Sequence, residues 1–300
     1  MLTVKNGTRD APTRGGVTLA PTLCPPPIEL AGCVRAFFWR DLAQASKEAH
    51  ETRIPPSAYP GIVWFTRGSG VLKERGGVAT SQVMPSITLS GAHRFPYLSE
   101  SSQGGDSFCL AFQPGALALL TGSDLGLLVD EIKDAQMWLP ADWSKFLAEV
   151  HQAPNHHARM QMCQGFLEPR WASLASHHAT WLRLLHVGWR RDARQTAARE
   201  LGWTLRHFQR RTLQLVGLRP GEIERMLRVE HALLDMRDAN LEPPDVASCQ
   251  GYADQSHFTK ETRAVFDKPP GALKHHVLCE HSDADWLLRR YLPQNSISAV

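Results

Sequence analysis

The chain has 300 residues, 43% of them hydrophobic, and a formal net charge of +3. A single hydrophobic core rarely grows past roughly 250 residues, so this length favours two domains over one. The sequence contains no apolar run near the roughly 18 residues that a membrane-spanning helix needs. Its polar start, MLTVKNGTRDAPTRGG, lacks the apolar core of a signal peptide. We therefore expect a soluble, cytoplasmic protein with no membrane partner.

The positive charge is concentrated in one segment. Residues 181–237 hold 12 Lys and Arg against 6 Asp and Glu, whereas residues 1–180 hold 15 of each kind and residues 238–300 hold 6 against 9. A localised basic segment is typical of proteins that contact phosphates. A solvated, Arg-rich helix surface would have the same composition, so charge alone does not separate the two interpretations.

The residue pattern of the N-terminal half changes along its length. Residues 1–26 are rich in Pro, Gly and Thr and predict a loose segment, followed by a domain over residues 27–188. Gly and Pro punctuate its first part, to about Gln113, which predicts a small antiparallel sandwich or barrel. Its β-like runs are CVRAFFWR, YPGIVWFTRG, GVLKER, SQVMPSITL and SFCLAFQ. Helical patterns follow from Pro114, in PGALALLTG, SDLGLLVDEI, ADWSKFLAEVH and ASHHATWLRLLHVGW.

Two stretches of the C-terminal half share one pattern. In LGWTLRHFQRRT, Gly202 ends one predicted helix, ARQTAARELG, and Thr204 caps a second that runs to about Val216. GYADQSHFTKETR repeats the arrangement, with Asp254 as the cap and an aromatic residue, Phe258, four positions later, as Phe208 follows Thr204. A surface helix with a solvated polar face would explain either stretch alone. Their tandem occurrence favours two helix-turn-helix units.

Further helices are predicted around these units. RPGEIERMLRVEHALLDMRD predicts a long helix that connects them, and PPDVASCQG predicts the first helix of the second unit. Residues 279–300 form a tail with one helical run around DADWLLRRYL.

From about Arg191 to His276 the chain closely resembles the AraC/XylS class of bacterial transcription regulators. The resemblance rests on AARELGWTLRHFQRRT, GLRPGEIERMLRVEHAL and VASCQGYADQSHFTKETRAVFDKPPGALK. It implies a DNA-binding domain over residues 189–278, with two helix-turn-helix units on a shared helix and both recognition helices in successive major grooves. The DNA-contacting positions that it implies are Arg206, His207, Gln209, Arg210, Gln255, Ser256, Thr259 and Lys260.

The sequence departs from the pattern of this class at three positions. Thr212 and Thr262 stand where the class usually has a large apolar residue, so we expect weaker anchoring of both recognition helices. A buried threonine hydroxyl can bond to a carbonyl of the preceding helical turn, so the loss concerns packing rather than hydrogen bonding. Lys260 replaces the usual arginine, which favours phosphate contact over bidentate readout of guanine. We therefore expect the first unit to supply most of the affinity.

The N-terminal half resembles the sensor domains of the same class through the order of its elements. The implied fold class is α+β in two domains: a small N-terminal β-sandwich or barrel, cupin-like, with following helices, and an all-α tandem helix-turn-helix domain. Trp39 and Trp64 are the candidate residues of an effector pocket, but core packing is the role that large aromatic residues favour by default. The amphipathic helices between Ser123 and His186 predict a homodimer interface.

Catalytic and metal sites receive little support from the sequence. The doublets His156-His157, His177-His178 and His275-His276 are poor chelates, because adjacent helical residues point about 100° apart. The six cysteines form no C-x-x-C and predict reduced, mostly buried thiols. RGSGVLKERGG lacks the P-loop pattern and predicts a hairpin turn. We therefore predict no cofactor, no metal and no catalytic residue.

The sequence thus predicts a sequence-specific DNA-binding transcription regulator, associated with the bacterial nucleoid. Its expected partners are double-stranded DNA, a second copy of the chain, RNA polymerase and an unidentified small-molecule effector. One alternative is a cupin-like, metal-dependent enzyme with an accessory helix-turn-helix tail. Another is a regulator without any small ligand.

Overall fold

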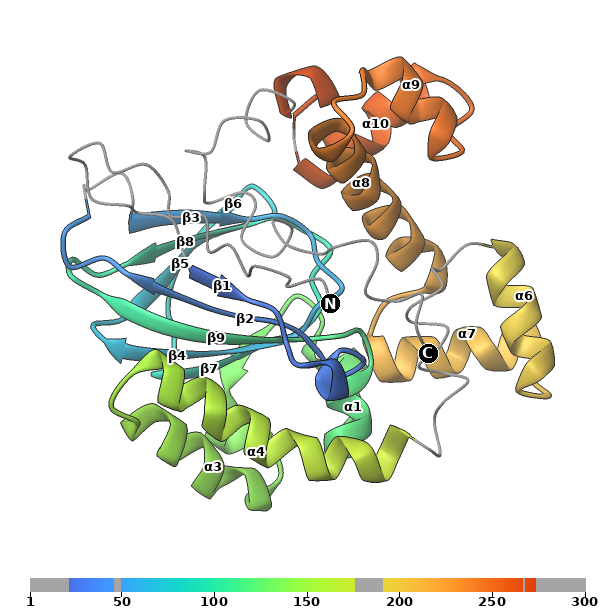
Figure 1. Ribbon diagram of the computed structural model, residues 1–300. Coiled ribbons are helices and arrows are strands. Elements are labelled where there is room, and N and C mark those ends of the chain that lie inside the picture. The colour runs from blue at the N-terminus through green and yellow to red at the C-terminus, as the bar shows by residue number, and fades with distance from the viewer. Residues whose placement is uncertain (1–21, 46–49, 176–190, 267, 274–300) are drawn as a thin grey trace, which may run out of the picture.

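The computed structural model describes residues 22–45, 50–175, 191–266 and 268–273 (Figure 1). A sheet-rich N-terminal domain is followed by a helical C-terminal region, as the sequence predicts. We call the first part the β-domain. Within these ranges, no helix is long and apolar enough to cross a membrane.

The β-domain is built from two antiparallel sheets that face each other (Figure 1). The larger sheet has the strand order β1-β2-β9-β4-β7-β10, and the smaller one has the order β3-β8-β5-β6. Strands of the larger sheet are β1 (Thr22–Cys24), β2 (Val34–Asp41), β4 (Gly61–Arg67), β7 (Ile87–Ser90), β9 (Asp106–Phe112) and β10 (Ile132–Asp134). Strands of the smaller sheet are β3 (Glu51–Ile54), β5 (Gly70–Arg75), β6 (Val78–Val83) and β8 (Tyr97–Ser101).

The five β-like runs of the sequence all contain strands, but four further strands carry no such pattern. One run, SQVMPSITL, is split into β6 and β7 around Pro85, which has no N–H for a ladder. The unpredicted strands are β1, β3, β8 and β10. The expectation that residues 1–26 are loose is wrong at Thr22–Cys24, because these residues pair with Phe37 to Trp39 of β2. Strands β1, β3 and β10 lie at sheet edges, where the neighbour's backbone, not an apolar pattern, holds them.

The stretch SDLGLLVDEI is not the predicted amphipathic helix. It forms a short 3-10 turn, η3 (Leu125–Leu128), and then leads into β10. The chain reverses at Asp130, which has a φ of 59°. The Asp130 carboxylate accepts hydrogen bonds from the backbone N–H of Arg94 (2.7 Å) and from its Nε (2.7 Å). These contacts hold a conformation that a continuous helix would not contain.

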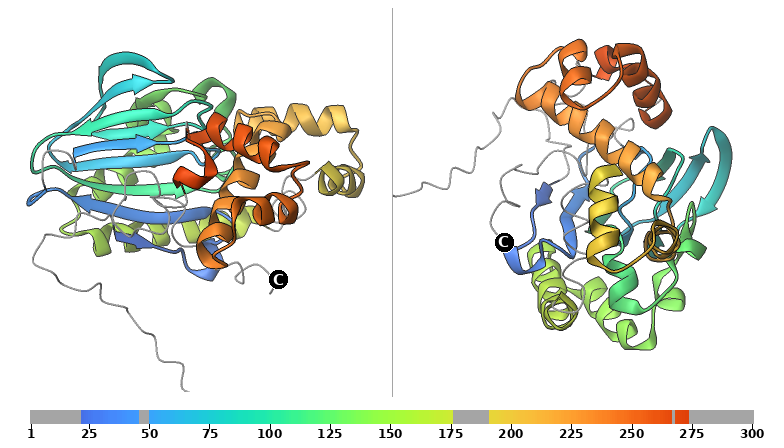
Figure 2. Two further views of the ribbon diagram at one scale, coloured as in Figure 1. Left: turned by 90° about the horizontal axis from the view of Figure 1, so that it is seen from above. Right: turned by 90° about the vertical axis from the view of Figure 1, so that its right-hand side faces the viewer.

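Helices cover the outer face of the larger sheet (Figures 1 and 2). They are α1 (Ala116–Thr121), α2 (Ala135–Trp138), α3 (Ala141–Gln152) and α4 (His156–Ala175). The sequence predicts α1 and α3 but misses α4, which contains Pro169. Cys163, Leu167 and Trp171 of α4 are spaced four residues apart and buried in the core. Most of the predicted helix ASHHATWLRLLHVGW falls outside the described residues.

The apolar face of α3 is covered within the chain. Trp143, Phe146, Leu147 and Val150 are buried, and the Trp64 indole donates a hydrogen bond to the Leu147 carbonyl (3.0 Å). This helix therefore needs no second copy to bury its apolar side chains, so it gives no support to a dimer interface.

The cysteines are mostly buried. Burial raises the pKa of the Cys33, Cys109 and Cys163 thiols. In the described ranges no cysteine is in a disulfide.

The C-terminal region has the predicted helix order. It consists of α6 (Arg191–Glu200), α7 (Leu205–Val216), α8 (Pro220–Asp238), α9 (Pro243–Cys249) and α10 (Gln255–Phe266). Its two helix-turn-helix units are buried in different ways. Phe208, Leu215 and Met226 of the first unit belong to the same hydrophobic core as the β-domain. The second unit has a core of its own, which includes Val229, Leu233 and Phe258.

The contact between α7 and the β-domain is close at Gly217. This residue ends α7 with a φ of 81°. A Cβ at Gly217 would lie 2.2 Å from Val129 Cγ2 and 2.9 Å from the Leu125 carbonyl oxygen. Gly202 also has a positive φ, of 66°, but a Cβ there would meet nothing within 4 Å. A substitution at Gly202 would therefore cause backbone strain alone, whereas one at Gly217 would also disturb the packing between α7 and the β-domain.

We predict that Gly217→Ala destabilises the protein more than Gly202→Ala. Both substitutions force a left-handed backbone on alanine, at a cost of about 1–2 kcal/mol. Gly217→Ala must also displace α7 from η3, and overpacking of this kind adds about 1–3 kcal/mol. Urea denaturation of the full chain measures both losses. Equal losses would contradict close packing between α7 and η3.

Candidate DNA interface and interior cavity

The two recognition helices begin at the predicted caps. The Thr204 hydroxyl accepts a hydrogen bond from the His207 N–H (3.2 Å) at the start of α7. The Asp254 carboxylate accepts one from the His257 N–H (2.7 Å) at the start of α10. Each cap satisfies an amide that the helix leaves unpaired and so fixes the first turn.

Thr212 and Thr262 lie on the buried faces of the recognition helices. Both are fully buried, and their hydroxyls donate to the Phe208 carbonyl (2.9 Å) and the Phe258 carbonyl (2.8 Å). The predicted back-bonding is confirmed. Phe208 is buried in the core shared with the β-domain, and Phe258 is buried in the core of the second unit, so each supplies apolar bulk one turn before its threonine.

The DNA-contacting positions that the resemblance implies lie on the outer faces of α7 and α10. Arg206, Gln209 and Arg210 are exposed on α7, as are Gln255, Ser256 and Lys260 on α10. His207 and Thr259 are half-buried. The His207 ring packs against Trp203, and its Nδ1 lies 3.3 Å from Arg210 Nη2. Contact of these side chains with DNA stays a prediction.

Three residues that the sequence did not single out, one of them on α7, lie beside the outer face of that helix. Arg194, Leu213 and Arg219 line a surface hollow together with Arg206, Gln209 and Arg210. Leu213 is 44% exposed and follows Gln209 by four positions, which places both on one face of the helix. From its residue type alone, a leucine is expected in the core. The sequence therefore did not indicate that Leu213 is exposed beside the arginines.

The hollow beside α7 is basic. Four arginines line it against one carboxylate, Glu222, which accepts a hydrogen bond from the Arg219 backbone N–H (2.7 Å). Arg194 forms an ion pair with Glu224 on α8 (2.8 Å). The remaining positive charge faces solvent, where it can attract phosphates.

The second recognition helix is fixed to α8 by polar contacts. Arg228 of α8 binds Glu261 of α10 through two nitrogens, at 2.8 Å from Nη2 and 3.2 Å from Nε. The Arg228 guanidinium also lies 4.9 Å from the centre of the Tyr252 ring. Gln250 donates to the Asp235 carboxylate (2.5 Å). These contacts hold the second unit against α8.

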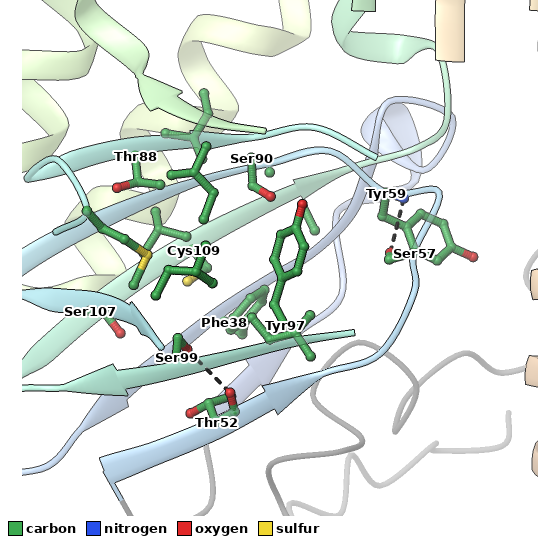
Figure 3. A pocket seen from close by; sticks show the side chains of 18 of the residues that line it. Phe38, Thr52, Ser57, Tyr59, Thr88, Ser90, Tyr97, Ser99, Ser107 and Cys109 are labelled. Atoms are coloured by element: carbon green, nitrogen blue, oxygen red, sulfur yellow. Dashed lines mark hydrogen bonds between the residues drawn. The ribbon is translucent and has the colours of Figure 1, made fainter. Parts of the chain in front are cut away.

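A cavity of about 170 Å³ lies between the two sheets (Figure 3). Its wall is largely apolar and includes Phe38, Ile54, Ile62 and Leu72. Hydroxyls are contributed by Thr52, Ser57, Tyr59, Ser90, Tyr97 and Ser99, and Tyr97 projects between the sheets. These serines and threonines explain why strands such as β8 lack an apolar pattern: their inward residues face a cavity rather than a packed core.

The charged groups of the cavity wall are engaged by the protein. Arg40 donates to the Thr52 hydroxyl (2.5 Å), and His93 Nε2 lies 2.9 Å from the Pro55 carbonyl oxygen. Of the described residues that line the cavity, none is Asp or Glu. The Tyr97 hydroxyl is buried without a hydrogen-bond partner among the described residues. Burial and the nearby Asp130 raise the pKa of Tyr97, so its phenol stays neutral and can donate.

Trp39 and Trp64 do not line this cavity. Trp64 is fully buried and packs edge-on against Phe146 of α3. Trp39 is half-buried and stacks on His156 of α4 at a centroid distance of 5.3 Å. The pocket role predicted for the two tryptophans therefore does not hold for this cavity. Core packing, their alternative role, fits both positions.

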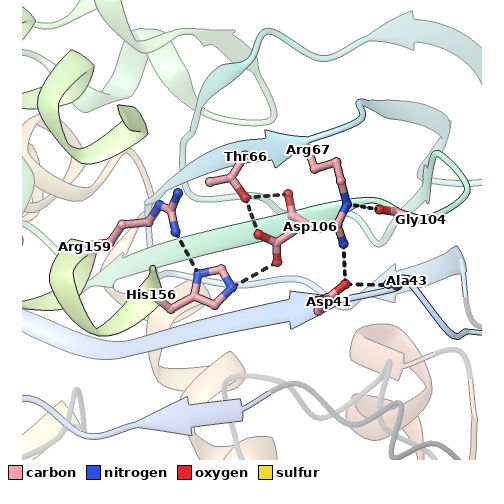
Figure 4. A network of polar contacts seen from close by, with 8 residues as sticks. All are labelled: Asp41, Ala43, Thr66, Arg67, Gly104, Asp106, His156 and Arg159. Carbon is pink, nitrogen blue, oxygen red and sulfur yellow. Dashed lines mark hydrogen bonds and ion pairs between the residues drawn. The ribbon is translucent and has the colours of Figure 1, made fainter. Parts of the chain in front are cut away.

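A polar network ties the start of α4 to three strands (Figure 4). Asp106 of β9 lies 3.0 Å from His156 Nε2 and accepts a hydrogen bond from the Thr66 hydroxyl. Burial acts to raise the pKa of Asp106, but the hydrogen bonds from His156 and Thr66 outweigh it and lower this pKa. His156 thus contacts a single carboxylate. The described residues contain no group of three or more metal-ligating side chains, and the doublets at 177–178 and 275–276 lie outside them.

Comparison with known proteins finds two family models, which match separate parts of the chain. Residues 197–276 match the family model of a helix-turn-helix domain, and residues 22–134 match a domain of unknown function (DUF6597). The C-terminal region is an AraC-type helix-turn-helix domain. The protein is accordingly a DNA-binding transcription regulator. No curated protein matches the chain.

The AraC-type domain and the β-domain together have distant likeness to solved structures of ToxT from Vibrio cholerae. An apo variant from strain SCE256 is 14% identical with a TM-score of 0.40, over 80% of this chain and 97% of that one. The unsaturated fatty acid-bound wild type is 11% identical with a TM-score of 0.38, over 79% and 94%. ToxT from strain O395 is 13% identical with a TM-score of 0.39, over 77% and 97%.

We predict that Asp106→Asn makes the stability of the protein less dependent on pH. The folded-state pKa of Asp106 is lowered, so its carboxylate stabilises the fold at neutral pH, and this contribution is lost as pH falls through the folded-state pKa. The substitution should cost about 1.5–3 kcal/mol at pH 7, the range for hydrogen bonds to a charged group, and much less in acid.

Thermal unfolding between pH 7 and 3 checks this expectation. Asp142→Asn is the matched control, because the Asp142 side chain is 62% exposed and its ion pair with Arg170 is long, at 3.8 Å. A constant difference between wild type and Asp106→Asn over the whole range would contradict the assigned role.

Proposed function

We propose that the two recognition helices read successive major grooves on one side of a DNA duplex. The observation that carries the proposal is the single helix α8, which holds both units. Met226 packs in the core of the first unit, and Val229 and Leu233 pack in that of the second. Its 19 residues give a rod of about 28 Å, similar to the roughly 34 Å between successive major grooves on one face of DNA.

The two recognition helices differ in what they offer to DNA. Arg210 is exposed beside a basic hollow and has a planar guanidinium, which can donate two parallel hydrogen bonds to guanine. Lys260 is exposed on α10 and carries a compact point charge that suits a phosphate. We therefore assign base readout mainly to the first unit and backbone contact mainly to the second.

Arg210→Ala should weaken binding to a selected duplex by about 1–3 kcal/mol and relax the base preference at one position. Lys260→Ala should weaken binding to all duplexes alike. Selection from a random duplex library gives the preferences, and fluorescence anisotropy at one fixed salt concentration gives the affinities. Lys145→Ala on α3, whose side chain is 86% exposed, controls for the loss of one charge. Relaxed base preference in Lys260→Ala with unchanged preference in Arg210→Ala would reverse the assignment.

We further propose that the β-domain modulates DNA binding through a small molecule in its cavity. The wall favours an uncharged, mostly apolar ligand, because it holds no carboxylate among the described residues and its basic groups have protein partners. The neutral Tyr97 hydroxyl offers the ligand one donor. A carbonyl, ether or hydroxyl oxygen on the ligand would match it.

Acetophenone and benzoate test the ligand class, since they are similar in size and only benzoate is charged. We expect acetophenone to bind the full chain more tightly, because benzoate would lose its hydration while Arg40, the arginine of the cavity wall, is already held by the Thr52 hydroxyl. Tyr97→Phe should weaken acetophenone binding by about tenfold through loss of one hydrogen bond. Titration calorimetry measures both. Tighter binding of benzoate would contradict the proposed class.

A further inference from the structure

A buried ion pair joins the β-domain to the connecting helix. Arg35 of β2 binds Glu230 of α8, and their side chains are only 4% and 3% exposed. The two residues are 195 positions apart in the chain. Because removal of one partner would leave the other charge buried and unpaired, this contact fixes where α8 lies on the β-domain.

Tyr59 connects this ion pair to the cavity. It lies in the segment between β3 and β4, and its hydroxyl donates to Glu230 Oε2 at 3.4 Å. Its ring lies over the Arg35 guanidinium, with 4.7 Å between Cζ and the ring centre. Tyr59 is also a lining residue of the cavity, and Figure 3 shows it at the right edge, with its ring pointing away from the other labelled residues. A molecule in the cavity would therefore touch the residue that bridges both charges.

Glu230 sits where α8 passes from one core to the other. Met226, one turn earlier, belongs to the core shared with the β-domain, whereas Val229 and Leu233 belong to the second unit's core. Arg228, two residues before Glu230, holds Glu261 of α10. A shift of α8 at this point is thus passed to the second recognition helix.

We propose that Arg35, Tyr59 and Glu230 form an interdomain latch, through which the contents of the cavity set the position of α8 and of the second recognition helix. A ligand that displaces Tyr59 withdraws its hydroxyl from Glu230 and loosens α8. The coupling to a ligand rests on the proposed modulation through the cavity. The latch itself rests only on contacts of the free protein.

The latch is tested first without any ligand, by hydrogen exchange of the full chain. Tyr59→Phe keeps the ring over Arg35 and removes only the hydroxyl, so amides of residues 226–234 should exchange up to about tenfold faster, as expected for loss of one bond to a charged group. Thr121→Val is the control. It removes a half-buried hydroxyl of the same domain that donates to the Leu117 carbonyl (2.8 Å), and it should leave these amides unchanged. Equal exchange in the two variants overturns the latch.

The second test measures coupling to DNA with acetophenone as the probe. The double variant Arg35→Met with Glu230→Leu replaces both charges by apolar side chains and avoids leaving one unpaired. Acetophenone should change the affinity of wild type for a selected duplex, and this change should vanish in the double variant. An equal change in both proteins overturns the latch and leaves the cavity's role intact. No change in wild type, together with faster exchange in Tyr59→Phe, rejects modulation by this ligand class and supports the latch.

Discussion

The arrangement of the protein depends on the burial of one helix, α8, from two directions. Near its start, Ile223 and Met226 pack into the core that the first helix-turn-helix unit shares with the β-domain. One turn later, Val229 and Leu233 pack into the core of the second unit. Each fully buried side chain of this kind contributes about 1.5–3 kcal/mol, so the packing of this helix exceeds any single polar contact around it. The spacing of the recognition helices and their relation to the β-domain both follow from it.

The C-terminal region was predictable because its signals are local. A cap, an aromatic residue four positions later and a terminal glycine specify α7 within fifteen residues. A cap and an aromatic residue at the same spacing indicate α10, which has no terminal glycine. Thr212 and Thr262 depart from the usual pattern, and each hydroxyl donates to a carbonyl on its own helix. Local signals do not indicate which residues distant in the sequence will pair. The pairing of Arg35 with Glu230 spans 195 positions and is invisible in either segment alone.

The β-domain was harder to predict, for a related physical reason. Strands that pack against a core alternate in polarity, but β8 and parts of its neighbours face a cavity lined with hydroxyls. Edge strands such as β1 are held in place by hydrogen bonds to the backbone of an adjacent strand. The two tryptophans point away from the cavity toward α3 and α4, since large aromatic rings fill a core more readily than a ligand site. Residue type indicated burial correctly but not which side of the sheet each ring faces.

The positions of the two hydrophobic cores also bear on which parts of the molecule unfold together. The first helix-turn-helix unit has no core separate from that of the β-domain, because Phe208, Leu215 and Val216 pack into the same cluster. A fragment that begins near residue 190 would expose these apolar side chains to water. Cooperative unfolding units follow shared burial rather than sequence motifs. We therefore expect the boundary between two such units to fall within α8, between Met226 and Val229. The β-domain and the first unit should then unfold as one body, and the second unit can open separately only when the Arg35–Glu230 pair also breaks.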